Sequence, residues 1–163
     1  MRAIPAPGTM SGVTTDETST GTARHTFSVG GSDAALDQRL NDELDRHNAA
    51  ATPDVEPARE LTVRVEDEDG DLVAGVSGWT WGEAAGIAMT WVDGRVRGLG
   101  VGRDLLAAFE TEARARGCTH VFTTSFTFQA PGFHEAAGYR ETFRWEGVPT
   151  TGRDDVHLRK ELV

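Results

Sequence analysis

The sequence predicts an α+β (mixed α/β) domain in which helices flank a central, mostly antiparallel, twisted sheet of about six or seven strands. Two observations predict it. Three strand patterns separated by turn signals form a meander, and a strong amphipathic helix then alternates with further strands. The predicted element order is β-α-β-β-β-α-β-α-β-β. The chain has 163 residues, which is enough for one domain with a sizeable core and too few for two ordinary ones.

The first 50 residues predict three segments: a tail, a short strand and a helix. Residues 1–23 are rich in Thr, Ser, Gly and Pro, which predicts a disordered tail. Residues 24–163 are expected to form a single domain. Residues 24–29 (RHTFSV) predict a short strand. Residues 30–50 predict a helix with a cap at Ser32 or Asp33 and an i, i+4 repeat of Leu36, Leu40 and Leu44.

The meander follows in residues 59–67, 72–81 and 85–92. Apolar residues alternate with polar ones in the first of these segments, and EDGD between the first two is a hairpin turn signal. The expected antiparallel strands lie next to one another along the chain.

The second half predicts a helix over residues 101–117, which Gly117 ends, with Leu105, Leu106, Phe109 and Ala113 on one face. A strand over 119–128 and a short helix over 130–138 come next. The segments YRETFRW and DVHLRKEL predict a final pair of strands.

The net charge limits which kinds of partner the protein is expected to bind. The formal net charge is −10, which opposes nucleic-acid binding and weakly favours a cationic or neutral substrate. Cys118 is the only cysteine, so no internal disulfide can form. The sequence has no apolar run long enough to span a membrane, and its N-terminus lacks the apolar stretch of a signal peptide, so we expect a cytoplasmic protein without a membrane partner.

The loop VRGLGVGRDLL (96–106) carries glycines at alternate positions before a helix. A dinucleotide-binding turn would need an acidic residue at the end of the next strand, which ends instead in Thr124, Ser125, Phe126 and Thr127. A P-loop would need a lysine, which this loop does not contain. The third interpretation is R-x-x-G-x-G, a loop whose free N–H groups at a helix N-terminus cradle a pyrophosphate.

With this loop, the sequence resembles the GNAT acetyltransferases. The family's upstream strand ends in an aromatic-Val pair, which MTWV (89–92) matches. Its downstream A-x-x-F-Y-x-x-x-G-F motif is matched by residues 130–139, with His134 in place of the usual Tyr. The resemblance implies a GNAT-like fold, acetyl-CoA as cosubstrate, and no metal.

The resemblance also implies roles. Backbone groups near Trp91 and Val92 would pair with the pantetheine arm and polarise the thioester carbonyl. The loop amides would hold the pyrophosphate, with the following arginine, the end of the next strand and the motif phenylalanine completing the cofactor site. The implied cofactor-binding residues are Trp91, Val92, Arg97, Gly98, Leu99, Gly100, Val101, Gly102, Arg103, Thr127 and Phe133.

His134 would face the CoA sulfur and act as the acid, or it is a half-buried helix residue without a role. Glu83 is a candidate base that acts through water. Trp79 and Trp81 share one face of their strand and form either an acceptor pocket wall, which attracts ammonium groups, or plain sheet packing. The remaining histidines show no metal-ligand spacing and are interpreted as structural or surface residues: His25, His47, His120 and His157.

The expected function is an acetyl-CoA-dependent N-acetyltransferase in which the primary amine of a small molecule or peptide attacks the acetyl group directly. The alternative is a catalytically silent acyl-CoA-binding sensor or partner module. Because the family is often dimeric, a homodimer is among the expected states.

Overall fold

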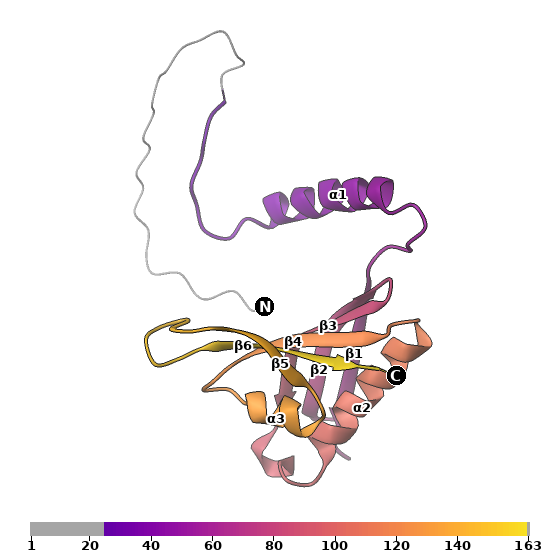
Figure 1. Ribbon diagram of the computed structural model, residues 1–163, viewed down its shortest axis with the longest axis vertical. Helices are drawn as coiled ribbons and strands as arrows, with labels where there is room; N and C mark the ends of the chain where they lie inside the picture. Colours follow the sequence, from indigo (N-terminus) through magenta and orange to yellow (C-terminus); the bar gives the residue numbers. More distant parts are fainter. Residues whose placement is uncertain (1–24, 163) are drawn as a thin grey trace. The chain divides into compact units, whose positions relative to one another are not determined.

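The structure is a computed structural model that describes residues 25–162 (Figure 1). The predicted tail over 1–23 lies outside the described residues. The chain divides into two compact units, Met1–Ala50 and Ala51–Val163, which are described separately.

The first unit contains α1 (Ala34–Ala51). The carboxylate of Asp33 accepts the backbone N–H groups of Ala35 and Leu36 at 3.1 and 3.0 Å, so Asp33 is the predicted cap. The strand predicted over 24–29 is wrong, because residues 25–29 are irregular and pair with no described strand. A single strand leaves its backbone groups unpaired, and Phe27 in this segment is 90% exposed.

The second unit is built on a six-stranded sheet with the order β1-β2-β3-β4-β6-β5. All neighbouring strands are antiparallel except β3 and β4, which are parallel. The predicted α+β architecture and the antiparallel meander are therefore confirmed. The strands are β1 (Arg59–Glu66), β2 (Leu72–Trp81), β3 (Ala84–Val92), β4 (His120–Phe126), β5 (Arg140–Trp145) and β6 (Asp155–Glu161).

Two helices pack on one face of this sheet, α2 (Val101–Ala115) and α3 (Pro131–Ala136) (Figure 1). A short 3-10 helix, η1 (Gly94–Val96), precedes α2. The predicted apolar face of α2 is buried against the strands. Its residues join one continuous core with every second side chain of the central strands: Leu105, Leu106, Phe109, Ala113, Val76, Ile87, Val121, Val156 and Leu158.

The opposite face of the sheet is called the open face, because neither α2 nor α3 covers it. Large apolar side chains project from it and are 40 to 55% exposed: Met89, Trp91, Phe122, Phe143 and Trp145. Exposed apolar side chains gathered on one face of a sheet are a feature of sites that bind a ligand or another surface.

The two parallel strands separate part-way along their length. β3 and β4 pair only from Ala84 with His120 to Ile87 with Thr123. Beyond this point β3 continues to Val92, while β4 continues to Phe126 and stays paired with β6. The gap between residues 88–92 and residues 124–126 is called the split.

A β-bulge lies at the point where the split begins. Ser77 of β2 pairs with Met89 and Gly78 pairs with Ile87, so Ala88 has no partner on β2. A bulge inserts an extra residue and increases the local twist of its strand. It accounts for the turning of β3 away from β4 one residue after their last pair.

No helix within residues 25–162 combines the length and the apolar character that crossing a bilayer requires.

Candidate functional site

The glycine loop turns the chain from η1 into α2. Gly98 and Gly100 have φ angles of +78° and +88°, which residues with a Cβ rarely adopt. Gly100 is the N-cap of α2 and has no side chain with which to cap the helix. The sequence therefore uses glycine at these two positions to make a turn that leaves the helix N-terminus bare.

The first turn of α2 presents free backbone donors. The amide of Asp104 donates to the carbonyl of Gly100 at 3.0 Å and makes the first bond of the helix. The amides of Val101, Gly102 and Arg103 precede that bond and have no acceptor within the helix. Together with the positive end of the helix dipole, they form a site suited to an anion such as phosphate.

Gly102 lies at a close contact between α2, α3 and β3. A Cβ at this position would lie 2.8 Å from a ring carbon of Phe133 and 3.3 Å from a methyl group of Val92. The space that a side chain would need is therefore occupied by α3 and β3. Gly102 lets α2 approach these two elements closely.

Three arginines surround the loop of this acidic chain. Arg95 pairs with Asp93 at 3.0 Å, and Arg103 pairs with Asp104 at 2.9 Å. Arg97 donates from Nε to the carbonyl of Val92 at 3.0 Å, and among residues 25–162 it forms no ion pair. Its position ties the loop to the end of β3 and leaves its terminal nitrogens available to a ligand.

The end of β3 forms one wall of the split. The side chain of Val92 packs near Gly102 on the helix side. Trp91 lies on the open face and is 47% exposed. Because β4 no longer pairs with this part of β3, the backbone edge of residues 88–92 is available to an extended ligand.

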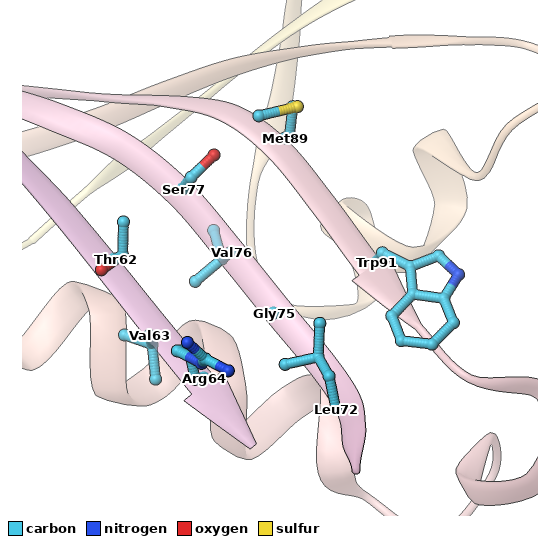
Figure 2. Close-up of a pocket in the computed structure, with 9 residues that line it drawn as sticks. All are labelled: Thr62, Val63, Arg64, Leu72, Gly75, Val76, Ser77, Met89 and Trp91. Carbon is cyan, nitrogen blue, oxygen red and sulfur yellow. The ribbon is translucent and has the colours of Figure 1, made fainter. Parts of the chain in front are cut away.

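A hollow of about 520 Å³ lies beside Trp91 on the β1 side of β3 (Figure 2). It forms because Gly75, with no side chain, stands between Arg64 and Trp91 in one row across the three strands. The hollow is thus separated from the split by β3. Its lining is Thr62, Val63, Arg64, Leu72, Gly75, Val76, Ser77, Met89 and Trp91.

Phe133 and His134 are adjacent in α3 but have different surroundings. The ring of Phe133 lies against Gly102, next to the glycine loop. His134 is only 6% exposed, and its ring packs edge-on against Tyr139 with the centroids 5.5 Å apart. Burial lowers the pKa of His134 to about 4, so its imidazole is neutral near pH 7. A neutral imidazole can still donate through its N–H, so the role of His134 as the acid stays a prediction.

Thr127 follows the end of β4 and is held by Asp154, the residue before β6. Its amide donates to the carbonyl of Asp154 at 2.9 Å, and its hydroxyl accepts the amide of Asp154 at 3.1 Å. Both bonds fix the far wall of the split, and a contact from Thr127 to a cofactor stays a prediction.

The predicted acceptor residues lie on the meander at the opposite end from the glycine loop. The ring of Trp79 lies over Gly86 and contacts Phe122 edge-on at 5.4 Å, one row before the split. Trp81 pairs with Ala84, two residues farther away. Glu83 is exposed in the turn before β3 and four residues before Ile87. That separation is about 13 Å along a strand, which excludes a direct hydrogen bond at the split.

A pair that the sequence patterns did not single out lies on β6. Nε2 of His157 is 3.6 Å from a carboxylate oxygen of Asp155. The nitrogen and the other Asp155 oxygen are shielded from solvent and lack hydrogen-bond partners. The i, i+2 spacing in DVHLRKEL places both side chains on one face of a strand, but it does not show where that strand lies relative to the split.

The family profile described as the acetyltransferase (GNAT) family matches residues 29–139. The chain belongs to the GNAT acetyltransferase family. Blasticidin-S acetyltransferase of Streptomyces morookaense is 39% identical over 77 residues, which cover 45% of this chain and 54%, about half, of that relative's length. An acetyltransferase of Agrobacterium fabrum is 27% identical over 66% of this chain and 77% of that protein.

A solved GNAT-like structure supports the same assignment. The crystal structure of an acetyltransferase from Bacillus cereus has a TM-score of 0.71 and 28% identity, and the match covers 83% of this chain and 97% of that one. The predicted family, fold and acyltransferase class are thereby confirmed.

Within residues 25–162, no three His, Cys, Asp or Glu side chains gather in a group that could hold a metal ion.

Proposed function

We propose that this GNAT protein transfers an acetyl group from acetyl-CoA to a primary amine of a small cationic molecule. The single observation that carries the proposal is the bare N-terminus of α2 behind two left-handed glycines, at the end of β3 where the split opens. Hydrogen-bond donors for a phosphate, next to an unpaired strand edge, suit a ligand with a pyrophosphate and an extended arm that carries amide groups.

The residues present fit acetyl-CoA. The amides of residues 101–103 and the terminal nitrogens of Arg97, whose Nε is bound to the carbonyl of Val92, would hold the pyrophosphate. The free edge of residues 88–92 would pair with the pantetheine amides. When bound, acetyl-CoA supplies an activated acetyl thioester.

The acceptor side supports a cationic amine. The half-exposed aromatic rings of the open face attract ammonium groups, and the net charge of −10 favours positively charged solutes. The relative from Streptomyces morookaense is named for blasticidin S. We therefore place amine-bearing antibiotics first among the acceptor classes, ahead of peptide amines.

The alternative, a silent acyl-CoA-binding module, is favoured by one observation. His134 stands at the position of the family's usual Tyr and is buried and neutral. If this imidazole gives no proton to the sulfur, the protein can bind acetyl-CoA without turning it over.

A thiol-release screen separates the two. The protein is incubated with acetyl-CoA and, in turn, blasticidin S, an aminoglycoside, spermidine, lysine and a short peptide. Amine-dependent release of CoA thiol, with one acetyl group added to the amine by mass spectrometry, supports the enzyme. Saturable acetyl-CoA binding without thiol release for any amine contradicts it and supports the module. A cytoplasmic location and a homodimer belong to the same proposal.

A further inference from the structure

The open face beside the start of the split carries a histidine, whose imidazole can move a proton. We infer that His157, held by Asp155, is the base that takes the proton from the acceptor ammonium. This inference rests on the proposed function and deepens it by assigning a residue to the proton transfer that direct attack requires.

The strand register places His157 at the start of the split. Its partner on β4 is Thr124, the first β4 residue beyond the last pair between β3 and β4. Paired residues of antiparallel strands project on the same side. Val156 and Leu158, the neighbours of His157, are buried in the core, so His157 projects from the open face.

β4 lies between β6 and the split, and paired strands are about 4.8 Å apart, so His157 lies one strand spacing from Thr124, where the split begins. An amine seated over Thr124 on the open face would lie between the imidazole and the unpaired edge of β3. Glu83, the base expected from the sequence, lies five residues before Ala88, about 17 Å along the strand.

The imidazole is held rather than loose. Asp155 contacts its Nε2 at 3.6 Å on one side, and the ring of Phe143 packs edge-on at 5.6 Å between centroids on another. Trp145 packs in turn on Phe143 at 4.8 Å. About a third of the His157 side chain (35%) is exposed although Nε2 is shielded, so the ligand-accessible part of the ring includes atoms other than Nε2.

This arrangement fixes the direction of proton transfer. Nε2 faces Asp155 and is shielded from solvent, so Nδ1 is the ring nitrogen to which the inference assigns the proton. The other charged residues on this face nearby are Arg159, which is paired with Glu161, and Arg140 opposite it on β5.

The step balances without any further reactant. The acceptor ammonium gives one proton to Nδ1 of His157. The neutral amine nitrogen then forms a bond to the acetyl carbon while the carbon–sulfur bond breaks with its electron pair on sulfur. The second amine proton ends on sulfur, giving the amide and free CoA thiol, and His157 returns its proton to water.

The test compares two amines that differ in charge but share an aromatic ring. Tyramine is an ammonium at neutral pH, whereas the aniline nitrogen of 4-aminophenol is neutral there and needs no base before it attacks. The variant His157→Gln should lower turnover of tyramine by roughly 10²- to 10⁴-fold, the typical contribution of a general base. Turnover of 4-aminophenol should fall by less than about tenfold.

Controls separate the base from a structural role. His120→Gln removes a histidine from β4 at the row of Ala84, away from the split, and should change neither amine's turnover. The melting temperature and acetyl-CoA affinity of His157→Gln should match those of the native protein. If this variant does not fold, Asp155→Asn replaces it and should lower tyramine turnover selectively.

The outcomes distinguish the two levels of the proposal. Unchanged tyramine turnover in His157→Gln, or equal losses for the two amines, overturns the base assignment while leaving the acetyltransferase intact. A native protein that acetylates neither these amines nor any amine of the screen overturns the proposed function, and this inference with it.

Discussion

The two faces of the sheet differ in what positions their functional groups. On the packed face, α2 and α3 cover a continuous apolar core, and the glycine loop presents backbone amides whose direction depends on φ angles. On the open face, the groups are side chains from β2, β4, β5 and β6, and several are half exposed. A site built from backbone amides can be predicted from a local sequence motif. A site built from side chains of separate strands cannot, because it depends on the order of the strands in the sheet.

The largest expected effect concerns the buried histidine of the packed face. In the folded protein the imidazole of His134 has a pKa of about 4, whereas in the unfolded chain it takes a proton at about pH 6.5. As the pH falls from 6.5 to 4, the unfolded state binds the proton first, so the free energy of unfolding decreases by about 3 kcal/mol. His134→Phe should remove this decrease, as measured by urea unfolding across that window.

The same variant tests whether His134, unlike His157, has no part in proton transfer. If His134 is only a core residue, His134→Phe turns over like the native protein at pH 7. A loss of tenfold or more would support the predicted acid role and place a proton-transfer group on the packed face.

The second prediction overfills the junction between α2 and α3. Gly102→Val places new methyl groups against Phe133, where a Cβ alone already lies 2.8 Å from the ring. Overpacking of this kind costs about 1–3 kcal/mol and should also displace the amides that bind acetyl-CoA. Thermal unfolding with and without acetyl-CoA measures both effects.

A matched control is Gly94→Ala, since a Cβ at Gly94 meets no atom within 4 Å. That variant should keep both the melting temperature and the shift that acetyl-CoA causes. If Gly102→Val behaved like Gly94→Ala, the close approach of the two helices would be unnecessary for the site.

The third prediction concerns the left-handed turn. Gly100→Ala forces a residue with a Cβ to a φ of +88°, which costs about 1–2 kcal/mol. The helix N-cap should relax, so acetyl-CoA affinity should fall together with stability. Unchanged affinity, measured by isothermal titration, would show that the turn does not orient the donors.

The smallest effect is expected from the loop arginine. Arg97→Gln removes the positive charge and keeps a hydrogen-bonding group that can reach the carbonyl of Val92. Loss of one charge-assisted phosphate contact at an exposed position should weaken acetyl-CoA binding about tenfold without affecting the melting temperature of the free protein. Arg64→Gln on the open face is the control, and its affinity should stay that of the native protein.

Local patterns predicted most of the fold because most elements satisfy their own hydrogen bonds and periodicity. The meander, the α2 helix with Gly117 at its end, and Asp33 as a cap all follow from residues within a few positions of one another. The strand expected over 24–29 failed because a short segment of strand propensity does not form a strand without a partner.

The candidate site divides in the same way. The motif in residues 97–102 predicted the bare helix N-terminus, which is a local property. Nothing in the sequence showed that β6 inserts between β4 and β5, and this insertion brings His157 to the split. The bulge at Ala88 likewise depends on the register with β2, and Phe133 rather than His134 meets the loop because adjacent helix residues point about 100° apart.

The division of labour between the two faces is tested most directly by comparing acetyl-CoA with S-acetylpantetheine in a binding titration of the native protein. If the amides of α2 hold the pyrophosphate, acetyl-CoA at a hundred times its Kd stabilises the fold by about 2.7 kcal/mol, and S-acetylpantetheine, which lacks the pyrophosphate, binds at least about a hundredfold more weakly. Equal affinities for the two ligands, or no binding of acetyl-CoA at millimolar concentration, would contradict the account.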